Sequence, residues 1–171
     1  DSTQAVKGQL LFEPSDTVSI RLIGDYSRGS GNCCYATSDY INGPTQPLVD
    51  ALTRALGLRV PSRDLGDFQQ TLNTEGRQTI TDYGGTLLGE FRLGAGTLKS
   101  VTALRRFNLD QNDMDPDFSG ADLFRYYETF KSRFFSQELT YSARIDAINA
   151  DMVLGAFYSN ENLDMTRVLP W

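Results

Sequence analysis

Six stretches of the sequence have the character of extended strands, and the period-two alternation of apolar and polar residues in most of them constrains the fold more than any other feature. The stretches cover residues 6–13, 17–27, 77–92, 97–107, 129–143 and 151–158. In the second of them, Val18 and Ile20 fall on one side of an extended chain and Arg21 falls on the other. We therefore predict an all-β protein, mainly β, whose strands form an antiparallel up-and-down meander of about six.

The pattern assigns the two faces less clearly in some of these strands. In the fourth stretch, Leu98 and Leu104 share a side with Arg106, and the sixth stretch is apolar on both sides. Gln137 interrupts an otherwise apolar side of the fifth stretch. In the third, Gly84–Gly85 predicts either a β-bulge or a close approach of two backbones.

The connections between the strands alternate in length. Residues 14–16, 93–96 and 144–149 are short turns, whereas residues 28–75 and 108–128 are long loops. In a barrel that spans an outer membrane, short turns lie at one water interface and long loops at the other. The order therefore favours an arc of a transmembrane β-barrel, although a soluble sandwich with one solvated face shows the same alternation of side chains.

One short helix is predicted inside the first long loop, because apolar residues recur at helical spacing between Pro47 and Gly57. Proline is favoured in the first turn of a helix and glycine just past its end. Asp50 and Arg54 have the i,i+4 spacing of an ion pair on such a helix. An irregular loop without a helix is the alternative.

Charge and composition argue against several classes of function. The formal net charge is −6 and the pI is near 4.6, whereas nucleic-acid binding needs a basic patch, so we expect no nucleic-acid partner. The sequence contains no histidine, which removes Ser-His-Asp and Cys-His mechanisms, and we expect no enzyme. No run of about 20 apolar residues predicts a membrane-spanning helix, but a spanning strand needs alternation over only about ten.

An acidic run at Asp110–Asp117 raises the question of a cation site, since hard cations bind carboxylate oxygens. The calcium-loop pattern fails because Phe118 stands where the turn needs glycine, and Phe124 where a bidentate glutamate is needed. We expect a solvated acidic loop, with an adventitious or ligand-assisted cation site as the alternative. Neither a metal ion nor a cofactor is predicted.

The two cysteines, Cys33 and Cys34, are adjacent in the sequence. Their spacing fits neither a zinc ribbon nor a Cys-x-x-Cys redox motif. Three interpretations stay open: a strained vicinal disulfide, a pair of loop thiols, and two reduced small residues in a loop.

Several of these stretches also resemble one protein family. Gly8–Asp16 and Ile23–Ser27, followed by the cysteine pair, look like an early barrel hairpin and loop of TonB-dependent outer-membrane receptors. Leu98–Arg105 resembles the same family, and Phe135–Leu139 with Gly155–Tyr158 resembles its next hairpin. The similarity runs through nearly all 171 residues, and the Phe-Ser-Gln-Glu-Leu stretch is its most specific part.

The resemblance implies a receptor of the bacterial cell outer membrane that takes up a scarce, bulky nutrient, commonly a ferric siderophore. Such receptors have a barrel of about 22 strands whose lumen holds a plug domain, and the TonB system of the inner membrane supplies the energy. Residues 1–171 would be a partial barrel region that lacks the plug, the TonB box and the remaining strands. Their partners would be the plug, the TonB system, outer-membrane lipid and a small-molecule or metal-chelate ligand.

A second class of function fits the same strands, namely a soluble β-sheet ligand-binding module that is secreted or periplasmic. The two classes differ in what covers the apolar side of the sheet. An isolated barrel arc has two open edges, so we expect it to self-associate.

Ligand contacts in such a receptor would come from outer loops and lumen-facing side chains, through charge and aromatic stacking. Ordinary loop surface is the alternative for each of them. The candidate contacts are Arg28, Tyr35, Tyr40, Arg54, Tyr126 and Tyr127.

Overall fold

The computed structural model of the chain contains a single antiparallel sheet of six strands in sequence order. It describes residues 1–32 and 43–170. The strands are β1 (Ser2–Ser15), β2 (Val18–Asn32), β3 (Arg77–Leu93), β4 (Gly96–Met114), β5 (Tyr126–Ile145) and β6 (Ala150–Val168). The predicted fold class is confirmed: the chain is mainly β, and its strands form an up-and-down meander that is not closed.

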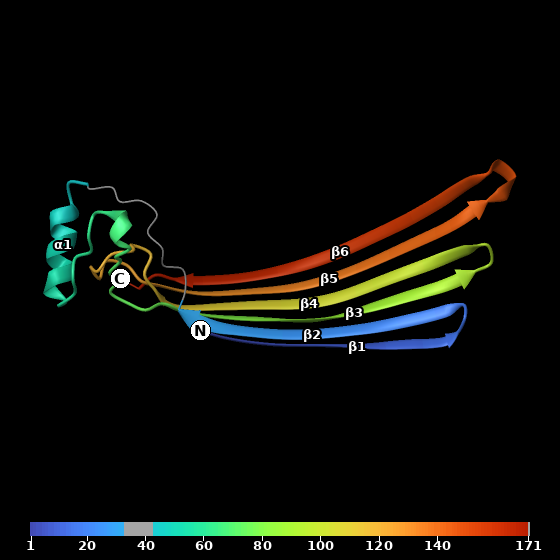
Figure 1. Cartoon of the computed structure of the whole chain (residues 1–171), viewed down its shortest axis with the longest axis horizontal. Coiled ribbons are helices and arrows are strands. Elements are labelled where there is room, and N and C mark those ends of the chain that lie inside the picture. The colour runs from blue at the N-terminus through green and yellow to red at the C-terminus, as the bar shows by residue number, and fades with distance from the viewer. Residues whose placement is uncertain (33–42, 171) are drawn as a thin grey trace.

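All three hairpin turns lie at one end of the sheet, and the described parts of both long loops, residues 43–76 and 115–125, lie at the other (Figure 1). Gly94 and Ala95 form a two-residue turn between β3 and β4. Gly94 has a φ of +62°, a conformation that two-residue hairpins need and that glycine adopts without steric cost. The turn before β6 contains the 3-10 helix η2 (Asp146–Ile148). The predicted alternation of short and long connections is therefore also an arrangement in space.

The predicted helix is confirmed as α1 (Gln46–Ala55), with proline in its first turn and Gly57 at a φ of +74° just beyond its end. The prediction of an ion pair between Asp50 and Arg54 on the helix is wrong. Asp50 instead contacts Arg63, with 3.5 Å between the guanidinium nitrogen and the carboxylate oxygen. A short 3-10 helix, η1 (Leu65–Asp67), follows in the same loop.

The strands extend much farther toward the loops than the alternation predicts. The sixth predicted stretch ends at Tyr158, but β6 continues to Val168, and β4 continues to Met114 inside the second predicted loop. The extension of β6 places Asn160, Asn162 and Asp164 on the side that holds Leu154 and Tyr158, so it does not continue the alternation before it, although β5 and β6 stay paired from Tyr127 to Ile145. The backbone hydrogen bonds of neighbouring strands carry the sheet past the end of the side-chain signal.

The cross-strand register assigns every strand residue to one of two faces, because directly opposed side chains lie on the same side. We call one of them the apolar face. It holds the even-numbered residues of β1 up to Phe12, of β2, of β4 up to Asn112 and of β6, and the odd-numbered residues of β3 and β5. The other side is the charged face. The register thereby settles the two unclear strands: Leu98, Leu104 and Arg106 lie on the apolar face, and so do Leu154 and Tyr158.

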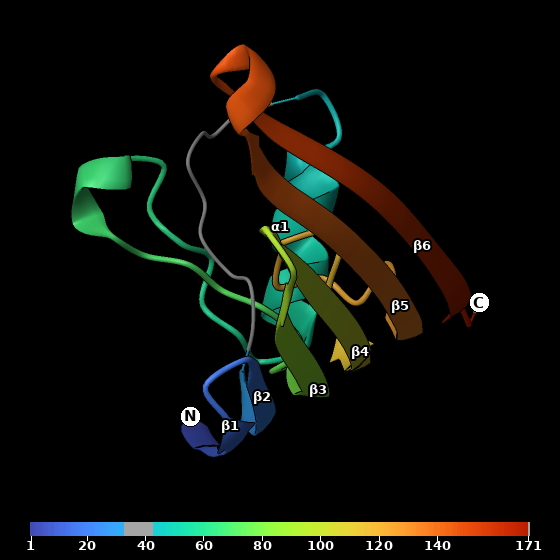
Figure 2. The same ribbon diagram turned by 90° about the vertical axis from the view of Figure 1, so that its right-hand side faces the viewer.

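The sheet has almost no core of its own. In the described part of the chain, Met114 and Ala121 are the only buried hydrophobic residues, whereas Leu10, Leu22 and Phe157 are each more than half exposed. β1 and β6 do not pair with each other in the described residues, and Figure 2 shows them at opposite ends of the sheet. Over residues 1–32 and 43–170, no helix is long and apolar enough to cross a membrane.

Candidate functional site

The apolar face carries a band without charged side chains next to the hairpin turns. Five successive cross-strand rows make up this band, from the row of Gly85 to the row of Leu93 on β3. At about 3.3 Å per residue, they cover roughly 27 Å along the strands. The band consists of Gly8, Leu10, Phe12, Val18, Ile20, Leu22, Gly24, Gly85, Leu87, Gly89, Phe91, Leu93, Gly96, Leu98, Ser100, Thr102, Leu104, Phe135, Gln137, Leu139, Tyr141, Ala143, Met152, Leu154, Ala156, Tyr158 and Asn160.

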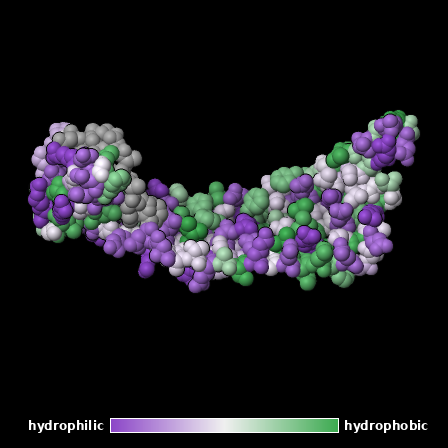
Figure 3. Space-filling view, in the orientation of Figure 1, coloured by the Kyte–Doolittle hydropathy of each residue, from purple (hydrophilic) through white to green (hydrophobic). Residues whose placement is uncertain are grey.

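Aromatic side chains mark the border of the band on the loop side. The rings of Tyr26 and Tyr83 are 6.4 Å apart between centroids, and those of Phe135 and Tyr158 are 6.1 Å apart. The border moves toward the turns from β2 to β6, as expected for strands that are tilted against the band. In the space-filling view, hydrophobic residues gather along the strands toward the turns, and the loop end is mainly hydrophilic (Figure 3).

The polar residue that interrupts the apolar side of β5 is satisfied within the band. Gln137 donates to the hydroxyl of Ser100 at 3.0 Å and accepts from the hydroxyl of Thr102 at 2.6 Å. A hydrogen-bonded side chain costs far less to remove from water than an unpaired one. The side chains of Gln137, Ser100 and Thr102 therefore add no charge to the band, and they pair with one another.

The charged face is crossed by ion pairs that run perpendicular to the strands. Arg105 of β4 contacts Asp82 of β3 and reaches over β3 to Asp25 of β2, at 2.9 Å. Asp25, Gly84 and Arg105 are directly opposite one another in the register, so Gly84 leaves the space that the arginine crosses. A Cβ at Gly84 would lie 2.6 Å from the carbonyl oxygen of Leu104. The predicted close approach at this glycine is confirmed, and the alternative bulge is not, since the register through it is continuous.

We expect Arg105→Gln to lower the free energy of unfolding by about 1 kcal/mol, because it leaves two neighbouring carboxylates without their shared cation. Denaturant titration of the chain in detergent micelles measures this change. Arg21→Gln is the control, since Arg21 lies on the same face and has no ion-pair partner among the described residues. Equal effects of the two substitutions would contradict a stabilising role for the ion pairs.

The two long loops meet beyond the loop end of the sheet and form what we call the cap, residues 43–76 and 115–125. Gly120 packs so closely on α1 that an added Cβ would clash with the side chain of Thr53, which is 2 % exposed. Thr74 donates to the backbone oxygen of Asp113 at 2.5 Å and ties the first loop to the end of β4. These contacts give the cap the small buried region that the sheet lacks.

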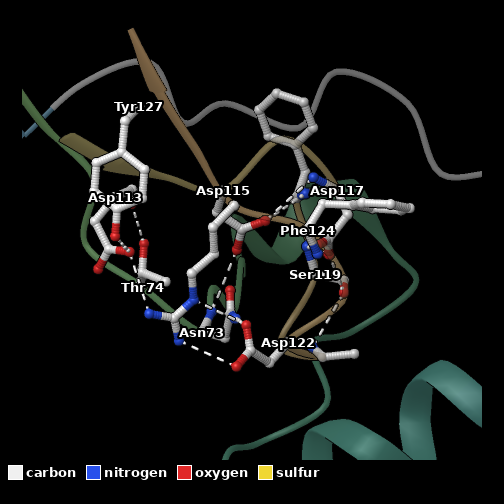
Figure 4. Close-up of polar contacts among 12 residues, drawn as sticks. Asn73, Thr74, Asp113, Asp115, Asp117, Ser119, Asp122, Phe124 and Tyr127 are labelled. Atoms are coloured by element: carbon white, nitrogen blue, oxygen red, sulfur yellow. Dashed lines mark hydrogen bonds and ion pairs between the residues drawn. The ribbon is translucent and has the colours of Figure 1, made fainter. Parts of the chain in front are cut away.

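Asp115 lies at the centre of the cap and is only 2 % exposed (Figure 4). Its carboxylate accepts hydrogen bonds from the backbone N–H groups of Phe118 at 3.1 Å, Asp117 at 3.2 Å and Asn73 at 3.4 Å. Burial and, next, the charge of Asp117 raise the pKa of Asp115 to about 6, against the opposing effect of the backbone N–H donors. Asp115 therefore ties the second long loop to the first.

The other acids of the run also have partners. Asp117 accepts from the hydroxyl of Ser119 at 2.5 Å, and Asp113 pairs with Arg125 at 3.2 Å. Arg125 also pairs with Asp122, which lies beyond the run, at 2.9 Å. The expectation of a solvated acidic loop is therefore wrong for Asp115, which is buried, and residues 110–114 belong to β4 and not to a loop. In the described ranges, no three or more histidine, cysteine, aspartate or glutamate side chains are grouped as a metal site requires.

The predicted ligand contacts do not come together in one site. Tyr126 lies on the charged face under the guanidinium of Arg167, which is 5.4 Å from the ring centroid, whereas Tyr127 lies on the apolar face and donates to Asp113 at 3.3 Å. Arg28 is on the apolar face of β2, and Arg54 is exposed on α1. The remaining candidates, Tyr35 and Tyr40 with Cys33 and Cys34, lie outside the described residues.

The sequence pattern indicated neither the burial of Asp115 nor the pair formed by Arg106 and Arg133. The two arginines are directly opposite each other at the loop-side border of the band. The alternation places Arg106 on a side with leucines, but only the register shows that Arg133 is its neighbour.

In comparisons with known proteins, neither a family model nor a curated protein gives a significant match to the sequence.

Proposed function

We propose that this chain is an arc of an outer-membrane β-barrel of the TonB-dependent receptor type, which takes up a bulky nutrient such as a ferric siderophore. The observation that carries the proposal is the contrast between the two faces. The apolar face has no charge over five rows, while the charged face has Arg21, Glu90, Lys99 and Glu138 on the same stretch of the strands. Lipid covers an uncharged face without the free-energy cost of burying a charge. Water or a plug domain in the lumen would solvate the charged face.

The ends of the sheet support the same proposal. Outer-membrane barrels have short turns on the periplasmic side and longer loops outside. The cap would then lie on the extracellular side, and the ion pairs around Arg105 would line the barrel interior. Ligand contacts would come from the cap and from the loop end of the charged face, where Tyr126 and Arg167 lie together.

The reading frame that encodes the chain tests the receptor proposal most directly. The proposal predicts a plug-sized domain with a TonB box upstream of Asp1 and further amphipathic strands that complete a barrel of about 22. A frame that encodes only this sheet, or this sheet within an unrelated multidomain protein, would contradict it.

Self-association distinguishes the proposal from a soluble β-sheet ligand-binding module. β1 and β6 are 14 and 19 residues long and exposed along nearly their whole length, so each offers unpaired backbone groups to another chain. In buffer without detergent, we expect light scattering to show oligomers or aggregates, and detergent to reduce them. A monomer that unfolds cooperatively in plain buffer would favour the soluble module.

A further inference from the structure

Two arginines stand side by side where the apolar band ends. Arg106 of β4 and Arg133 of β5 are directly opposite each other in the row next to the band, on the loop side. Like charges in this arrangement repel each other. Both side chains are exposed, and neither forms an ion pair or a hydrogen bond with any described residue. An anion between them would remove the repulsion.

The surface beside the two arginines is hollowed. A groove of about 400 Å³ is lined by Tyr83, Gly85, Leu104, Phe135 and the two arginines, together with Asn160 and Asn162. Gly85 contributes no side chain, and the apolar side chains of Leu104 and Phe135 continue directly into the band. The groove therefore offers two guanidinium groups at one end and an apolar surface at the other.

The charge around the groove differs in sign from that of the whole chain. The row of Arg106 and the next row toward the loops contain Arg28 and Lys131 as further cations, and Asp164 as their only acid. The chain as a whole has a formal charge of −6. The positive border of the apolar face is thus a local feature, not a consequence of composition.

We propose that this groove binds the phosphate of a phosphorylated membrane lipid in the leaflet on the loop side, with the acyl chains lying along the apolar band. The proposal rests on the proposed membrane location. Guanidinium groups bind phosphate oxygens in bidentate geometry, and two of them match the charge of a phosphate monoester. The head of such a lipid would lie at the level of Arg106 and Arg133, and its chains would follow the side chains below them.

Spin-labelled lipids test this proposal with the chain reconstituted in phosphatidylcholine vesicles. The motionally restricted fraction of labelled phosphatidylcholine reports lipid contact in general, and that of labelled phosphatidic acid reports phosphate selectivity. We expect the chain to prefer phosphatidic acid over phosphatidylcholine. In R106Q/R133Q, each arginine removed should reduce that preference about fivefold. The restricted phosphatidylcholine fraction should stay unchanged, which shows that the variant is still inserted.

The matched control is K7Q/R21Q, which removes two positive charges from the charged face. It should keep the preference for phosphatidic acid. An unchanged preference in R106Q/R133Q, or an equal loss in K7Q/R21Q, would overturn the lipid site while leaving the barrel proposal intact. Absence of any restricted lipid with the unsubstituted chain would contradict the membrane location, and the lipid site with it.

Discussion

Leu22→Arg is expected to destabilise the chain in phospholipid vesicles by about 2 kcal/mol, the cost of a cation on the lipid-facing side close to the middle of a bilayer. Leu22 lies one row from the centre of the five-row band, 51 % exposed and level with Leu87. In the proposed membrane, its neighbours are lipid chains that cannot hydrogen-bond a guanidinium group. Denaturant titration of vesicle-embedded protein, followed by circular dichroism, measures the change.

The neighbouring residue supplies the control for this experiment. Ile23 is on the charged face in a row whose other members are uncharged, so Ile23→Arg adds the same charge one residue away on the opposite side. We expect its cost to be below about 1 kcal/mol, since a solvated surface tolerates a new charge. Equal costs at the two positions would mean that lipid does not cover the apolar face.

The stability of the folded chain should depend on pH through Asp115 in the cap, and Asp115→Asn is expected to remove most of that dependence. In the folded chain the pKa of Asp115 is raised from 3.8 to about 6, so between these values the folded state holds a proton that the unfolded state has lost. The contribution of Asp115 to stability therefore falls as the pH rises through this window. The difference corresponds to about 3 kcal/mol between about pH 4 and about pH 7.

Urea unfolding at the two ends of this window tests the prediction, with Asp67→Asn as the control that removes a different carboxylate. Asp67 is an exposed residue of η1 that takes no part in the hydrogen bonds of Asp115. We expect the wild type and this control to lose stability relative to Asp115→Asn as the pH rises. If all three proteins change in parallel, Asp115 does not hold its proton in the folded cap.

The sequence predicted strands well where one side of the strand is apolar and the other polar. Residues 18–27 show this pattern clearly, and their pairing in the structure agrees with it. Past Tyr158 the pattern changes phase, with Asn160, Asn162 and Asp164 on the apolar face and Leu163 and Met165 on the charged face, although the backbone there is paired just as regularly. Side-chain alternation reports the environments of the two faces, and strand pairing can continue where those environments change.

The cap could not be predicted from local sequence. The run around Asp115 has the composition of a solvated loop, and its burial depends on Asn73, which is 42 residues away in the chain. The arginine pair was hidden for a similar reason, since the pairing of Arg106 with Arg133 is a property of the register between β4 and β5. Contacts between segments far apart in sequence decide both features.

Lipid contact at two adjacent residues tests whether the apolar band faces a membrane. Leu87 lies in the apolar band and Leu88 on the charged face, so Leu87→Cys and Leu88→Cys, each in a Cys33→Ser, Cys34→Ser background, carry one fluorescent label apiece. In vesicles of brominated phosphatidylcholine, bromine in the acyl chains quenches a label that touches them. We expect strong quenching at residue 87 and weak quenching at residue 88. Equal quenching at both residues, or none at residue 87, would contradict a membrane-facing apolar band.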